Sequence, residues 1–144
     1  MVLTLIAVLL CSGQSAPRNQ DGATLLSRTE AALLVYLTPP VSSFRKATGQ
    51  VPFFESLESD FNCDDYYVLY VSDPRPTEGT PTIGTFAVNK HTADVTNVGP
   101  ITEVEDPDLL GAQQILRAEH HIGDAVRKEF RDAPIWKQKR SSSR

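Results

Sequence analysis

The sequence is poor in the residues and motifs that build covalent cross-links, metal centres and reactive sites. It contains two cysteines, one methionine and one tryptophan among 144 residues. It has no closely spaced cysteine pairs of the zinc-binding kind, no glycine-rich phosphate loop and no Gly-x-Ser-x-Gly elbow. These absences remove the commonest sequence signatures of zinc sites, nucleotide phosphates and serine hydrolases.

An excess of positive charge is also lacking. The formal net charge is −4, which argues against a nucleic-acid binder because affinity for a phosphate backbone comes mainly from cations. Residues 18–126 carry 7 Lys and Arg against 16 Asp and Glu, a net of −9, whereas residues 127–144 carry 7 against 2, a net of +5. We interpret the last basic residues, 137–144, as a solvated, disordered tail.

The composition suits one folded domain. Hydrophobic residues make up 40% of the chain and charged residues 22%, so there are enough apolar side chains for a core. A length of 144 residues is typical of a single domain. We therefore expect one domain over residues 17–136, and a monomer.

The one long apolar run stands at the start, where residues 1–10 read MVLTLIAVLL and small or polar residues follow as far as Ala16. This pattern predicts a secretory signal over residues 1–16, and the run is too short to span a bilayer. We therefore expect export to the periplasm or the extracellular medium. Cys11 follows two leucines in the manner of a lipoprotein box, so a lipid anchor on Cys11 is the alternative, and membrane attachment is expected only in that case.

Removal of the signal would leave Cys63 without a cysteine partner in the mature chain. Two aspartates follow it directly, and neighbouring carboxylates disfavour the thiolate that a nucleophile needs. We therefore expect a buried, inert cysteine rather than a nucleophile activated by His91.

The first half of the sequence predicts one helix and one strand, separated by a segment whose secondary structure the pattern does not determine. Residues 24–37 repeat apolar residues at helical spacing, with Ser27 and Glu30 as a capping box, and the proline pair at 39–40 ends the helix. Residues 41–63 show no clear hydrophobic periodicity, so either a helix or a strand is possible there. Residues 65–72 alternate as a strand whose two faces are both apolar or aromatic.

The second half predicts a hairpin and a helix. Strands are expected over residues 82–89 and 94–98, joined by a tight turn. Asp106 and Pro107 open a helix that continues to Pro134. Its packed face is expected to carry Ile115, Ile122, Val126 and Phe130. This order predicts an α+β fold in which an antiparallel sheet of three to four strands packs against an N-terminal and a C-terminal helix.

Residues 84–95, GTFAVNKHTADV, resemble the strand-turn-strand hairpin of PepSY-like and cystatin-like small exported domains. The resemblance implies a curved antiparallel sheet wrapped on a helix, and a secreted or periplasmic binding or regulatory protein without catalytic residues. Ala93 stands where the family favours glycine, because the turn there needs a positive φ that costs alanine roughly 1 kcal/mol. Either the turn is rearranged or the resemblance is only local. The cystatin inhibitor signature Gln-x-Val-x-Gly is not met at Gln50.

Two histidines are the first candidates for a metal site. His120 and Asp124 stand one helical turn apart and could chelate together. The expected apolar face, however, places His120 and His121 on the outer flank of the helix, where such a pair is usually solvated. We therefore expect neither a metal nor a cofactor.

Three further residues are candidates for a pocket or an interaction surface. Glu119 falls on the predicted apolar stripe of the last helix, and Tyr66 and Tyr70 share one face of the strand at 65–72. The leading hypothesis is a non-catalytic exported protein that binds another protein or a small ligand. The alternatives are a small enzyme of the NTF2-like kind that uses the Glu119 carboxylate, and an envelope protein anchored through Cys11.

Overall fold

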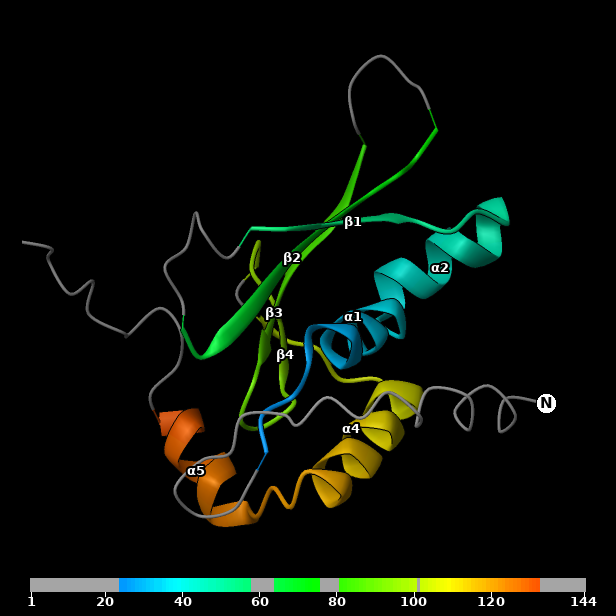
Figure 1. Cartoon of the computed structure of the whole chain (residues 1–144). Helices are drawn as coiled ribbons and strands as arrows, with labels where there is room; N and C mark the ends of the chain where they lie inside the picture. The colour runs from blue at the N-terminus through cyan, green and yellow to red at the C-terminus, as the bar shows by residue number, and fades with distance from the viewer. Residues whose placement is uncertain (1–23, 58–63, 76–80, 101, 133–144) are drawn as a thin grey trace, which may run out of the picture.

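The structure is a computed structural model and describes residues 24–57, 64–75, 81–100 and 102–132 (Figure 1). Within these residues the chain forms four helices and a five-stranded antiparallel sheet, which confirms the predicted α+β class. The helices are α1 (Arg28–Tyr36), α2 (Pro39–Thr48), α4 (Pro107–Glu119) and α5 (Asp124–Asp132), and the strands are β1 (Phe53–Ser56), β2 (Tyr66–Ser72), β3 (Thr82–Asn89), β4 (Val95–Asn97) and β5 (Thr102–Glu103).

Several predicted features lie outside the described residues. They are the signal segment 1–16 with Cys11, the tail 137–144, and Cys63. In the part of the chain that the structure describes, no helix is both long and apolar enough to cross a membrane.

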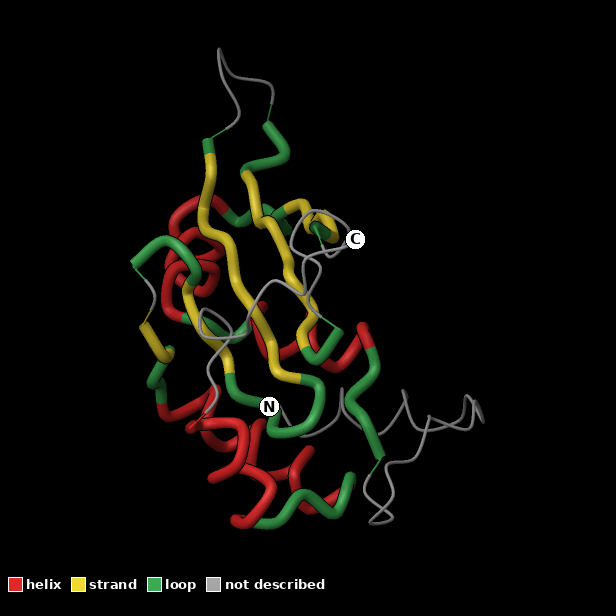
Figure 2. Tube along the Cα trace, turned by 90° about the vertical axis from the view of Figure 1, so that its left-hand side faces the viewer, coloured by secondary structure: helices red, strands yellow, loops and turns green. Residues whose placement is uncertain are grey.

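The strands follow one another across the sheet in the order β1-β2-β3-β4-β5, and every neighbouring pair is antiparallel. The two long strands β2 and β3 run side by side through its centre (Figure 2). The strands β2, β3 and β4 match the three predicted strands to within one residue at each end. The sheet gains its fourth and fifth strands from β1, in the segment left undecided, and from β5, which is only two residues long.

The helices α1, α2 and α4 lie on the same side of the sheet (Figure 1), where their apolar side chains form the main core with the sheet. Alternation along β2 directs Leu69 and Val71 into this core and Val68 to the opposite face. The buried members of the core are Leu26, Ala31, Leu34, Val35, Val41, Leu69, Val71, Phe86, Val88, Ala93, Val95, Leu109, Leu116 and Ile122. The opposite face buries a smaller cluster of Tyr66, Val68 and Ala87.

The capping box predicted for the first helix is present. The Ser27 hydroxyl accepts a hydrogen bond from the Glu30 amide, and the Glu30 carboxylate accepts one from the Ser27 amide at 2.6 Å. The helix begins later than predicted, at Arg28. The proline pair ends α1 as expected, but the same prolines then occupy the first turn of α2, where a missing amide hydrogen and a fixed φ are favourable.

The hairpin turn between β3 and β4 keeps the conformation that favours glycine. Ala93 has a φ of 62° and is fully buried, so the turn is not rearranged around the alanine. The side-chain oxygen of Asn89 accepts hydrogen bonds from the backbone amides of His91 at 2.8 Å and Thr92 at 3.2 Å. These bonds hold the turn in a conformation that costs an alanine free energy.

The single C-terminal helix predicted from the sequence is wrong, because the chain breaks into α4 and α5 around His121, which has a φ of 56°. The expected packed face of the first part is also wrong. Ile115 is 55% exposed, and the buried residues of α4 are Leu109, Gln113 and Leu116. Beyond the break, Ile122 is buried as expected.

Two glycines should respond in opposite directions to replacement by alanine. A Cβ on Gly84 would lie 2.8 Å from the ring of the fully buried Phe86, so Gly84→Ala is expected to lower the free energy of unfolding by about 1–3 kcal/mol. Gly111 is exposed within α4 with nothing within 4 Å of the added atom, so Gly111→Ala should raise it by about 0.5–1 kcal/mol. Urea unfolding of both variants measures this, and equal effects of the same sign would contradict the packing described.

Candidate interaction surface

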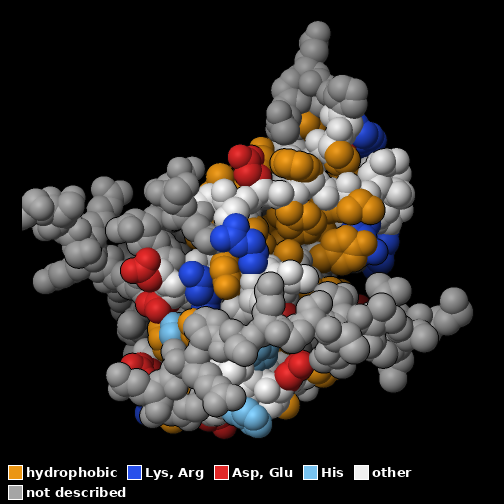
Figure 3. All heavy atoms as spheres, viewed as in Figure 1, with side chains coloured by type: hydrophobic (Ala, Val, Ile, Leu, Met, Phe, Trp, Pro, Cys, Tyr) orange, Lys and Arg blue, Asp and Glu red, His pale blue; other side chains and the backbone are white. Residues whose placement is uncertain are grey.

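Large hydrophobic side chains are exposed where the chain passes from α2 into β1. Val51 is 67% exposed and Phe53 is 57% exposed. The next residue along β1, Phe54, points the other way and packs against the main core. Figure 3 shows hydrophobic side chains gathered over β1 and α2 on this face of the molecule.

A local turn presents these side chains. Gly49 ends α2 in the left-handed conformation, with a φ of 69°, and its amide donates to the Arg45 carbonyl at 2.8 Å. A glycine at this position reverses the chain at the end of a helix without the cost that a Cβ would bring. The chain then returns along the sheet as β1, with Val51 and Phe53 at the surface.

A hollow of about 280 Å³ lies beside the exposed Val51, between the end of α2 and the start of β1. Its lining residues are Tyr36, Ser42, Arg45, Lys46, Gly49, Gln50 and Val51. The Arg45 guanidinium lies 3.6 Å from the centroid of the Tyr36 ring, within the range of a cation–π contact. The lining contains two basic residues, Arg45 and Lys46, and no acidic residue.

We call Tyr36, Arg45, Lys46, Val51 and Phe53 the β1 surface. The first four residues line the hollow, and Phe53 points to the face of the sheet opposite to Phe54. Tyrosine and arginine are among the residues that dominate binding energy in protein interfaces, and aromatic residues in general are enriched there. Neighbouring exposed hydrophobic side chains with polar residues around them are a feature of protein interaction sites. This arrangement is suited to binding a partner with apolar and acidic groups.

The predicted placement of His120 on the outer flank is wrong. His120 is 7% exposed and both ring nitrogens have partners, Glu30 Oε1 at 2.6 Å from Nε2 and Thr24 Oγ1 at 2.7 Å from Nδ1. The order hydroxyl, imidazole, carboxylate also occurs in nucleophilic catalysis. Here it joins the start of α1 to the end of α4, and a second hydrogen bond, from the Thr24 amide to the His120 carbonyl at 3.3 Å, supports the same junction.

The contact between Glu30 and His120 favours the charged form of both groups. Burial disfavours the Glu30 carboxylate, but hydrogen bonds from His120 and Ser27 outweigh it and lower its pKa from 4.5 to about 2. The hydrogen bond with Glu30 raises the pKa of His120 above its ordinary value, although burial acts against it. The pair is therefore an ion pair at mildly acidic pH.

A second charged cluster fixes α4 on the hairpin turn. Arg117 donates from Nη2 to Asp94 Oδ1 at 2.7 Å and from Nε to the Thr92 carbonyl at 2.8 Å. Gln113, buried in the same helix, donates to the Ala93 carbonyl at 2.9 Å. Burial lowers the pKa of Arg117 despite the neighbouring Asp94 carboxylate. These groups are committed to holding the fold together.

The candidate residues predicted from the sequence do not come together. Glu119 ends α4 and is exposed, outside the buried stripe on which it was expected. Tyr66 and Tyr70 share a face of β2 as predicted, but Tyr66 is buried. The Tyr70 hydroxyl lies 2.8 Å from Thr82 Oγ1 on β3.

His121 and Asp124, the other residues considered for a metal site, are exposed. Among the described residues no group of three or more His, Cys, Asp or Glu side chains is placed to hold a metal ion. His91, considered as a partner for Cys63, instead lies 2.8 Å from Asp65 and stacks on the Phe130 ring with centroids 4.4 Å apart.

The sequence did carry a signal for the β1 surface. A glycine that ends a polar helix, followed at once by Val51, Phe53 and Phe54, indicates a turn into an apolar strand. The alternation within four residues was too short to establish a period. The burial of His120 had no comparable signal, because its partner Glu30 lies 90 residues away.

Comparison with known proteins reveals a similarity of fold. No family model matches the chain, and no curated protein matches it. Among solved structures it is similar to a chain in a type VI secretion system effector-immunity complex from Pseudomonas protegens, with a TM-score of 0.56 and 18% identity over 75% of this chain and 88% of that one. The two chains share a fold.

The ion pair of Glu30 and His120 should make stability depend on pH. The Glu30 contribution is present above pH 4.5, its unfolded value, and is lost as the pH falls towards about 2. The His120 contribution is complete below its unfolded value of 6.5 and is lost as the pH rises through the raised folded value. The pair therefore stabilises the fold most between about pH 4.5 and 6.5. At pH 5.5, His120→Gln is expected to cost about 1–3 kcal/mol.

Urea unfolding at acidic, mildly acidic and alkaline pH measures this dependence. The exposed neighbour His121 provides the control, because His121→Gln should keep the wild-type profile. A His120→Gln variant with the same pH profile as the wild type would contradict the assignment.

Proposed function

We propose that this chain is a non-catalytic protein-binding domain, and that it acts as one member of a pair of the effector-immunity kind. The observation that carries the proposal is the β1 surface, where exposed Val51 and Phe53 lie beside a hollow lined by Arg45 and Tyr36. The fold is shared with a chain from an effector-immunity complex, and this likeness favours the same type of association.

The interior charges support a binding role over a catalytic one. His120, Asp94 and Arg117 are each held by hydrogen bonds to other parts of the fold. A catalytic acid or base must instead face the reacting atoms of a substrate. Glu119, the carboxylate considered for an NTF2-like enzyme, is exposed at the end of α4 and is not part of the hollow at α2.

Export is part of the same proposal. The apolar run at residues 1–10 and the small residues after it favour a cleaved secretory signal. A partner would then be met in the periplasm or outside the cell. Lipid attachment at Cys11 is the alternative form of the exported protein.

Binding of a protein partner predicts a stoichiometric complex. The purified chain, immobilised and exposed to periplasmic extract or culture fluid, should retain one protein that elutes with it as a single species in size-exclusion chromatography with light scattering. An unrelated bait of the same net charge is the control for nonspecific retention. Repeated capture that yields no stoichiometric partner would contradict the proposal.

Export predicts that the mature protein begins near residue 17. Intact-mass measurement of protein purified from its native compartment should show loss of the first 16 or so residues. A mass increased by acyl chains on Cys11, abolished together with membrane attachment in Cys11→Ser, would replace simple cleavage by lipid anchoring. A mass that includes Met1 would contradict export through this segment.

A further inference from the structure

The two edges of the sheet differ in what they offer another strand. At one edge β5 has two residues, Thr102 and Glu103. At the other edge β1 has four residues, and among the described parts of the chain no strand pairs with its outer side. An edge of this kind presents a row of amide and carbonyl groups that a further strand can bind.

The register shows which groups face outwards. The Leu57 amide donates to the Val68 carbonyl at 2.8 Å, and Phe53 and Glu55 stand opposite Ser72 and Tyr70. Hydrogen-bonded residues alternate along an antiparallel strand, so Phe53, Glu55 and Leu57 face β2. The backbone groups of Phe54 and Ser56 therefore face away from the sheet. The strand β1 itself contains neither a proline nor a bulge. Pro52 stands directly before it and has no amide hydrogen to donate, so the outward amides of this edge are those of Phe54 and Ser56.

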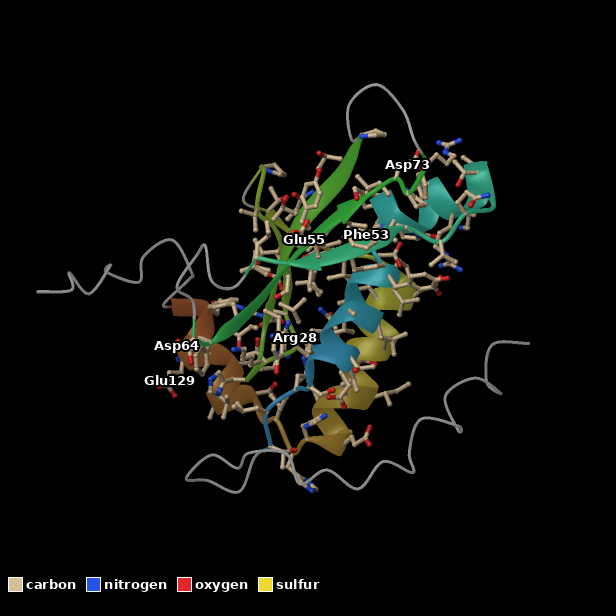
Figure 4. All side chains as sticks on the ribbon, turned by 45° about the horizontal axis from the view of Figure 1, so that its top comes forward. Arg28, Phe53, Glu55, Asp64, Asp73 and Glu129 are labelled. Carbon is tan, nitrogen blue, oxygen red and sulfur yellow. The ribbon has the colours of Figure 1, made fainter. Side chains whose placement is uncertain are left out.

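The charged side chains differ between the two ends of β1. Arg45 and Lys46 line the hollow together with Gln50 and Val51, which lie just before β1 begins. Glu55 is exposed towards the other end of the strand, and Figure 4 labels Phe53 and Glu55 along β1. Residues 18–126 carry a net charge of −9, and Arg45 and Lys46 are two of their seven cations.

We propose, on the basis of the proposed protein-binding function, that the partner adds an extended strand to the outer edge of β1. Its backbone bonds the outward groups of Phe54 and Ser56, and an apolar side chain lies on Phe53. Acidic residues at one end of the strand meet Arg45 and Lys46. Main-chain bonds supply much of the affinity in such strand addition, and the side-chain contacts supply specificity.

A second copy of this chain fits the edge poorly. If two β1 strands paired antiparallel through Phe54 and Ser56, the pairing would be centred on Glu55. The Glu55 side chains of the two copies would then lie directly opposite each other, and like charges in that position destabilise a strand pair. The charges favour a different partner, one that brings acids to Arg45 and Lys46.

The direct test uses synthetic probes in place of the partner. A short fluorescein-labelled peptide of alternating valine and threonine that ends in two aspartates is titrated with the full chain, and fluorescence anisotropy reports binding. Its twin ends in two lysines. The aspartate peptide should bind at least about fivefold more tightly than the lysine twin, and added salt should reduce the difference.

Matched variants locate the binding. Ser56→Pro removes one outward amide without removing a bond to β2, and it should weaken binding about tenfold. Phe53→Ser should weaken it similarly, whereas Ile115→Ser, at 55% exposure on α4, should not. Lys46→Glu should abolish the preference for aspartate, whereas Lys128→Glu on α5 should preserve it. Thermal unfolding of each variant checks that the fold is retained.

The possible outcomes separate this inference from the proposed function. Failure of both peptides to bind at millimolar concentration would overturn strand addition, as would binding unaffected by Phe53→Ser, Ser56→Pro and Lys46→Glu. A dimer of the chain that Ser56→Pro dissociates would overturn it in favour of self-association. A captured protein partner that binds these variants as well as wild type would uphold the proposed function and reject this edge.

Discussion

The partly buried ion pair of Glu30 and His120 is the polar contact that links the helices α1 and α4 of the main core. It joins residues 90 positions apart and fixes the start of α1 to the end of α4. Both helices lie on the same face of the sheet, where their apolar side chains form the main core. The turn at Gly49 then leads the chain from α2 into β1, which pairs with β2 at the edge of the sheet and leaves Val51 and Phe53 exposed.

The turn between β3 and β4 shows how tertiary contacts can override local preference. Ala93 holds a positive φ that favours glycine. The Asn89 side chain, Gln113 and Arg117 all bond backbone groups of this turn. The alanine methyl group is in turn buried in the core, so the position combines an unfavourable backbone conformation with favourable packing.

The features with a strong local pattern were predictable, and those set by distant contacts were not. The capping box at Ser27 and the central strands could be identified because their spacing is a property of a short stretch of sequence. In α2 Val41 is the one buried residue, so few apolar positions mark this helix in the sequence. The exposure of Ile115 depends on which face of α4 meets the hairpin, and that face is the one with Gln113 and Arg117. The sequence indicated Glu119 and Tyr66 as candidates but not the β1 surface, because the packing that exposes or buries a side chain is set by distant contacts.

The molecule combines an internally hydrogen-bonded core with an edge strand, β1, whose outer side pairs with no strand among the described residues. We propose that a partner protein occupies this edge. Hydrogen–deuterium exchange of the full chain, alone and saturated with its captured partner, tests that claim at the level of single amides. We expect exchange of the Phe54 and Ser56 amides to slow strongly in the complex. Unchanged exchange at these two amides, with protection appearing on another surface, would contradict it.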